Sequence, residues 1–216
     1  MSTSPDTFAA AGSDSDSAAA GGSDRVMRHA AVDRLFHWLT AITVLTLMGT
    51  ALLPIAGIRF DWIPIHWVAG IVLVVLVIFH ILRSMVWRKL RSIWFSVAEL
   101  RSGNVGKYSV AQKLMHHAMG LMVLGAVITG VVMLKKIKTP FLTRDPYIFG
   151  SDTWGVVYVI HGLAALAAVT LVMIHVYFGI VPENRMYLRA MVRGWITRKE
   201  QRSRLAANDW LEKKTT

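Results

Sequence analysis

Four apolar stretches, each close to the length needed to cross a lipid bilayer, dominate this sequence of 216 residues. The hydrocarbon core of a bilayer is about 30 Å thick, and about 20 helical residues span it. No alternation of apolar and polar residues competes with a helical interpretation. The sequence therefore predicts an all-α fold, an integral membrane four-helix bundle. The predicted spans run from about Leu35 to Leu53, Ile63 to Leu82, Leu114 to Leu134 and Trp154 to Val181.

The basic residues indicate the orientation of the bundle. The formal net charge is +11, and most of it flanks the spans, which is typical of a membrane protein rather than of a nucleic-acid-binding protein. Of the 24 Lys and Arg residues, 19 lie on the side that carries both termini and five on the other side. The positive-inside rule then predicts that both termini are cytoplasmic. The cluster KKIK at residues 135–138 is unusually basic for the outer side, and is either a solvated face or a docking surface for a partner subunit.

The segments outside the spans divide the chain further. Residues 1–24 are rich in Ala, Gly, Ser and Asp, without Lys or Arg, and are expected to form a disordered tail rather than a signal peptide. We expect this tail to be followed by a four-span domain over residues 25–200 and a cytoplasmic C-terminal tail over residues 201–216. Trp87–Leu100 is basic and amphipathic, which predicts an interfacial cytoplasmic helix. Tyr187–Leu205 is expected to lie at the interface in the same way or to contact a cytoplasmic part of a partner.

The absence of cysteine excludes several redox centres. Without thiolates the chain cannot ligate an iron–sulfur cluster through cysteine, attach haem covalently or form a disulfide. Eight histidines remain as candidate ligands. Histidine is costly inside a membrane span, where it usually faces the bundle interior and has a function.

His161 and His175 lie fourteen residues apart in the fourth span. On an α-helix this separation corresponds to a rise of about 21 Å and a rotation about 40° short of four turns. Both imidazoles therefore share one face, one near each side of the membrane. This spacing suits a helix that supplies one axial ligand to each of two stacked b haems, so the sequence predicts a membrane electron carrier.

The two axial ligands of one haem must lie at matching depth. His66 begins the second span on the outer side, level with His161, and these two are expected to form the outer pair. For the inner pair His175 has two candidate partners, His37 in span one and His80 in span two, and depth alone does not choose between them. The alternative for any one of these residues is a core imidazole bonded to a neighbouring carbonyl.

Other residues near the histidines are open to two interpretations. Small side chains would let a flat macrocycle approach the helix backbone, but ordinary helix packing explains them equally well. His116 and His117, at the cytoplasmic start of span three, are either interfacial or take part in proton handling. The small residues are Gly70, Gly162, Ala164 and Ala165.

Several motifs resemble the gamma subunit of membrane-bound formate dehydrogenases, a dihaem cytochrome b of the bacterial inner membrane. That family belongs to a wider group of bacterial four-helix cytochromes b that also serves hydrogenases and related molybdoenzymes. The resemblance covers about residues 25–200. In chain order the motifs are DRLFHW (33–38), IHWVAG (65–70), VGKYSVAQK (105–113), ITGVV (128–132) and IHVY (174–177).

The resemblance implies a set of haem ligands. His66 and His161 would bind the iron of an outer haem b, and His37 and His175 that of an inner one. The resemblance favours His37 over His80, because His37 stands where the family has its first-span ligand.

The resemblance also implies a menaquinone or ubiquinone site beside the inner haem, with Ser109 and Gln112 as candidate contacts. The family pattern has asparagine at the position of Ser109 and glycine at that of Ala111. A serine hydroxyl still hydrogen-bonds a quinone carbonyl, with a shorter reach than an amide. The alternative role for Ser109 and Gln112 is to cap the helix of span three.

The resemblance implies electron transfer in a respiratory chain. Electrons would pass from a partner iron–sulfur subunit through two haems to a quinone, in a formate dehydrogenase complex whose molybdenum-containing catalytic subunit is another polypeptide. This chain would carry no formate-oxidising site. The alternatives are the cytochrome b subunit of a hydrogenase or another respiratory oxidoreductase, and a haem-free four-span transporter or scaffold.

Overall fold

A computed structural model describes residues 25–87 and 110–203 of the chain. Within these residues, four helices are long and apolar enough to cross a membrane, which confirms the predicted all-α membrane fold. The tail at residues 1–24, most of the predicted interfacial helix Trp87–Leu100 and residues 204–216 lie outside the described part. The four helices are α2 (Ala31–Ile55), α3 (Trp62–Trp87), α5 (Val110–Met133) and α6 (Ser151–Ile180).

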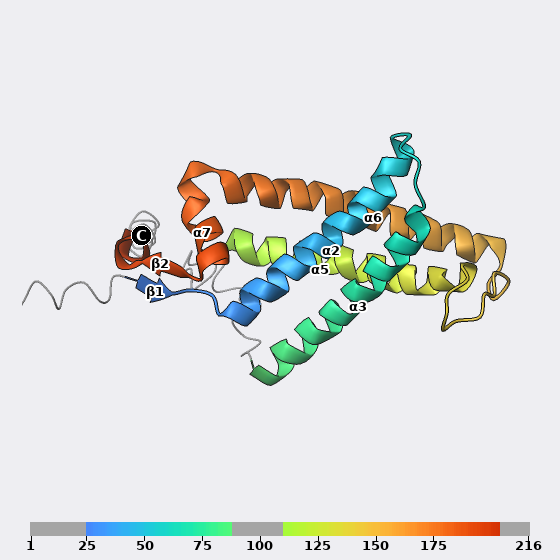
Figure 1. The fold of residues 1–216 in the computed structure, drawn as a ribbon, viewed down its shortest axis with the longest axis horizontal. Helices are drawn as coiled ribbons and strands as arrows, with labels where there is room; N and C mark the ends of the chain where they lie inside the picture. The colour runs from blue at the N-terminus through green and yellow to red at the C-terminus, as the bar shows by residue number, and fades with distance from the viewer. Residues whose placement is uncertain (1–24, 88–109, 204–216) are drawn as a thin grey trace, which may run out of the picture.

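The four helices form two hairpins that cross obliquely in Figure 1. Helix α2 packs against α3 and α5 packs against α6, while contacts between α3 and α5 join the hairpins. Residues 56–61 connect the first hairpin, and Gly57 there has a φ of 87°, which a residue with a Cβ rarely adopts. Residues 134–150 connect the second, beginning with the 3₁₀ turn η3 (Leu134–Lys136). These two connections define the loop end of the bundle, and the opposite end is the terminal end.

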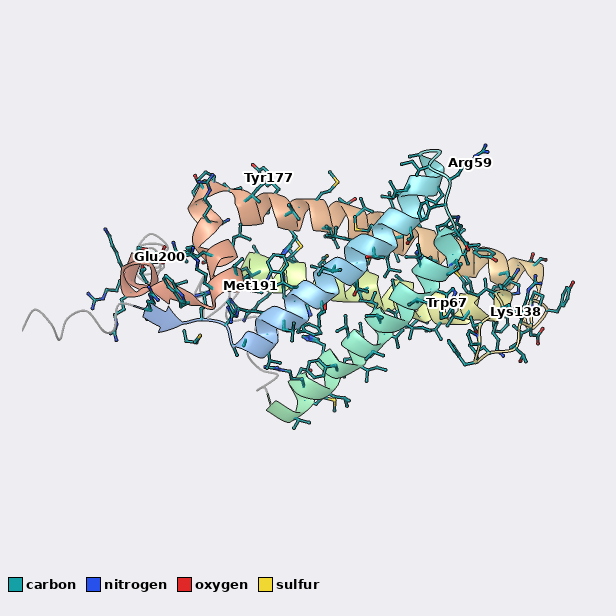
Figure 2. The ribbon with its side chains drawn as sticks, in the orientation of Figure 1. Arg59, Trp67, Lys138, Tyr177, Met191 and Glu200 are labelled. Carbon is teal, nitrogen blue, oxygen red and sulfur yellow. The ribbon has the colours of Figure 1, made fainter. Side chains whose placement is uncertain are left out.

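Apolar side chains are exposed along all four helices, as Figure 2 shows. This is expected of a bundle whose outer surface contacts lipid rather than water. Hydroxyl groups within the helices bond internally: Thr43 donates to the carbonyl of Leu39 at 2.8 Å, and Thr46 to that of Ile42 at 2.9 Å. Such bonds satisfy polar groups for which lipid offers no partner.

A small two-stranded sheet at the terminal end adds to the predicted fold. Strand β1 (Arg25–Met27) pairs antiparallel with β2 (Trp195–Thr197). The segments that precede α2 and follow α6 therefore lie together at one end of the bundle. Figure 2 shows Glu200 at this end and Arg59 and Lys138 at the other.

Tyr187–Leu205 is not one continuous helix, and its predicted place at the membrane interface or against a partner stays a prediction. The 3₁₀ turn η4 (Pro182–Asn184) and helix α7 (Arg185–Arg193) follow α6, and α7 ends at Gly194 before β2 begins. Gly194 has a φ of 90°, and an added Cβ would lie 3.1 Å from the carbonyl oxygen of His29. The helix breaks here because glycine alone fits both the left-handed conformation and the close backbone contact.

Candidate functional site

The structure brings His66 and His161 together from different hairpins. His66 lies in the first two turns of α3 and His161 in the half of α6 nearer the loop end. Their ring centroids are 6.3 Å apart and their planes meet at 71°. Gly130 on α5 lies against the second ring, because an added Cβ would be 3.4 Å from Cε1 of His161. His66 and His161 thus lie at the same depth in the bundle.

A threonine from the neighbouring helix contacts each of these imidazoles. Oγ1 of Thr50 on α2 lies 2.8 Å from Nδ1 of His66, and Oγ1 of Thr129 on α5 lies 2.9 Å from Nδ1 of His161. Sequence reasoning missed both threonines, because a hydroxyl in an apolar helix is ordinarily explained by a bond to its own backbone. The available signal was depth, since Thr50 near the end of span one lies level with His66 near the start of span two.

His37 and His175 form a second pair, closer to the terminal end. Their ring centroids are 6.2 Å apart and their planes meet at 47°. Nδ1 of His37 is buried and has no hydrogen-bond partner among the described residues. Trp38 packs edge-on against His37 at 5.3 Å, and its indole N–H donates to the carbonyl of Met191 on α7 at 3.3 Å. Helix α7 therefore helps to hold this end of α2 in place.

His80, the other candidate partner of His175, lies in different surroundings. Its ring stacks on Phe36 at 5.1 Å and is 5.8 Å from the ring of His116 on α5. The structure therefore places His37, not His80, beside His175, in the arrangement that the family resemblance implies.

The spacing within each pair fits two imidazoles bound to one iron. An imidazole nitrogen binds a metal ion at about 2.0–2.1 Å, so two rings on opposite sides of the ion have centroids about 6 Å apart. Two ligands alone do not complete a protein metal site. In residues 25–87 and 110–203 no group of three or more His, Asp or Glu side chains could hold a metal ion. The centroid spacing of both pairs fits a haem, whose macrocycle would supply the remaining ligands of the iron.

The small residues near the pairs divide into two groups. An added Cβ at Gly70 or Gly162 would meet no atom within 4 Å, so neither glycine is needed for close packing against a neighbouring helix. Ala164 is buried instead, and its Cβ would lie 3.7 Å from a Cβ added at Gly125 on α5. Ala164 thus serves ordinary packing between α5 and α6.

Of the two candidate quinone contacts, Ser109 lies outside the described residues. Gln112 lies in the first turn of α5 with an exposed side chain, at the terminal end of the bundle, which is also the end nearer to His37 and His175.

Comparisons with known proteins give one family and a set of distant relatives. The model of the prokaryotic cytochrome b561 family matches residues 28–194, a range that includes all four paired histidines. The chain is 23% identical to the formate dehydrogenase cytochrome b556(fdo) subunit of Escherichia coli strain K12 over 196 residues, covering 81% of this chain and 87% of the relative. The same subunit of Escherichia coli O157:H7 matches to the same extent.

Proposed function

The chain belongs to the prokaryotic cytochrome b561 family, and we propose that it is the cytochrome b subunit of a formate dehydrogenase-type complex in the bacterial inner membrane. The observation that carries this proposal is the pairing of four histidines, from three helices, at two depths of the bundle. The similarity to a formate dehydrogenase cytochrome subunit over most of both chains supports the choice of complex.

In this proposal each pair of histidines holds one haem b. His66 and His161 hold the haem nearer the loop end, and His37 and His175 hold the other. The bound haem supplies reversible one-electron transfer at its iron. Ligation uses the uncharged imidazole, which has a lone pair on one ring nitrogen.

The distribution of basic residues supports a terminal end on the cytoplasmic side. The loop end, with residues 56–61 and 134–150, then faces outward. In this orientation the loop end offers the docking surface for an iron–sulfur subunit, and Lys135, Lys136 and Lys138 supply positive charge for it. Formate oxidation belongs to a separate molybdenum-containing subunit.

The electron acceptor in this proposal is menaquinone or ubiquinone at the terminal end. The amide of Gln112 and the hydroxyl of Ser109 are groups that can donate hydrogen bonds to a quinone carbonyl. Because this end faces the cytoplasm in the proposed orientation, quinone reduction there takes its protons from the cytoplasm.

Purification of the affinity-tagged chain from native membranes tests the proposal. We expect an iron–sulfur subunit and a molybdenum-containing subunit to copurify, and formate to reduce the b-type haem of the complex. A His161→Ala variant is the control, because loss of the outer haem should leave the remaining haem oxidised when formate is added. A complex whose haem is reduced by hydrogen and not by formate would assign the chain to a hydrogenase instead.

A further inference from the structure

Thr50 and Thr129 occupy equivalent positions in the two hairpins. Each lies on the first helix of its hairpin and contacts Nδ1 of a histidine on the second helix, at 2.8 Å for His66 and 2.9 Å for His161. Both threonines are buried, with 5% and 7% of their surface exposed. The same contact is thus built twice, once on each side of one histidine pair.

The hydrogen on each hydroxyl can be assigned from its neighbours. Oγ1 of Thr50 lies 2.8 Å from the carbonyl oxygen of Thr46, and Oγ1 of Thr129 lies 2.7 Å from that of Gly125. A carbonyl oxygen only accepts, whereas Nδ1 of an imidazole either donates or accepts. Each threonine therefore donates its single hydrogen to the carbonyl and accepts one from Nδ1 of the histidine. The reverse assignment would leave the carbonyl contact without a hydrogen.

We propose that Thr50 and Thr129 are positioning residues that hold His66 and His161 in the tautomer with hydrogen on Nδ1. The lone pair of Nε2 is then free to bind the haem iron. This inference rests on the proposed function, because it requires a haem between the two rings. A hydrogen bond donated by the second ring nitrogen fixes the orientation of a ligating histidine and makes it a stronger donor to the metal.

In the pair of His37 and His175, the Nδ1 atom of His37 has no such threonine contact within the described residues, so this haem site can serve as a reference within the same protein. Nδ1 of His37 is buried and has no hydrogen-bond partner in the described part of the chain. Replacing Thr50 or Thr129 should therefore alter the haem site of His66 and His161 and leave the site of His37 unchanged.

The test is a redox titration of the purified full chain and of its Thr50→Val and Thr129→Val variants. A weaker imidazole donor stabilises ferric iron less, so the reduction potential of one of the two haems should rise. Loss of the hydrogen-bond partner of a ligating histidine typically costs 10–100-fold in metal affinity or activity. A tenfold loss of preference for the ferric state corresponds to a rise of about 59 mV for a one-electron couple. Partial or complete loss of that same haem would also support the proposal.

The haem that changes must be the one that His161→Ala abolishes. Thr50→Ser and Thr129→Ser keep the hydroxyl and should restore the wild-type potential and the wild-type electron paramagnetic resonance spectrum of the ferric haem. Thr43→Val is the matched control, because Thr43 is buried on the same helix with 8% exposed and bonds to the carbonyl of Leu39, without contacting an imidazole. Alanine replaces valine in any variant that does not fold.

Three results would each overturn this proposal and leave the proposed function standing. One is a wild-type chain with two haems whose potentials do not move in either valine variant. The second is an equal change in Thr43→Val, and the third is a serine variant that fails to restore the potential. A wild-type chain that binds no haem would instead overturn the proposed function, and this inference with it.

Discussion

His66 on α3 and His161 on α6 face each other with ring centroids 6.3 Å apart, although they belong to different hairpins. The second pair likewise joins α2 to α6, so α6 contributes one histidine to each pair. Within the described residues the direct packing is strongest inside each hairpin. A haem held by each pair would therefore add two connections between the hairpins, and haem binding is expected to stabilise their crossing.

In the proposed assignment His161 is one of the two protein ligands of the outer haem, so replacing it with alanine should remove that haem and keep the inner one. We expect the content of b-type haem to fall from two to one per chain. The measurement is a pyridine haemochrome assay on detergent-purified protein. Retention of both haems in this variant would contradict the assignment of His66 and His161 as a ligand pair.

Replacing His80 with alanine should leave the haem content unchanged, whereas His37→Ala should lose one haem. The reason is position, since His37 lies beside His175 while His80 stacks on Phe36. The two variants are compared by optical spectra and haem counts at equal protein concentration. If His80→Ala loses the inner haem and His37→Ala keeps it, then His80, and not His37, is the haem ligand that is paired with His175.

The sequence alone could predict one of the two histidine pairs but not the other. Matching depth was enough to predict that His66 lies beside His161. It did not choose between His37 and His80, because that choice depends on how each helix is rotated and tilted, which tertiary packing decides. Family resemblance favoured His37, and its role as a ligand remains a prediction. Gly194 was not identified as a helix terminator, because its φ of 90° and its close contact with the backbone of His29 are seen only in the structure.

Replacing Gly130 with valine should disturb the outer haem site. A Cβ at this position would lie 3.4 Å from Cε1 of His161, so the two added methyl groups would press on the imidazole. Overpacking of this kind typically costs about 1–3 kcal/mol. We expect reduced occupancy of one haem and an altered spectrum. Gly120→Val on the same helix is the control, because a Cβ there meets no atom within 4 Å; equal effects of both variants would contradict the contact with His161.

The absence of native cysteine allows a direct test of orientation. Arg59 at the loop end and Arg193 at the terminal end both have exposed side chains and can each be replaced by cysteine. In intact spheroplasts a membrane-impermeant maleimide should label Arg59→Cys and should label Arg193→Cys only after the membrane is permeabilised. The opposite labelling pattern would reverse the proposed topology and place the pair of His37 and His175 on the outer side.

The most direct test of the account is the number of b-type haems bound by the wild-type chain, measured by pyridine haemochrome on protein purified in detergent from cells with adequate haem supply. Two paired sites, His66 with His161 and His37 with His175, predict two haems per chain. Folded protein that carries no haem would contradict this prediction. A single haem that is retained in all four variants, each lacking one of these histidines, would also contradict it.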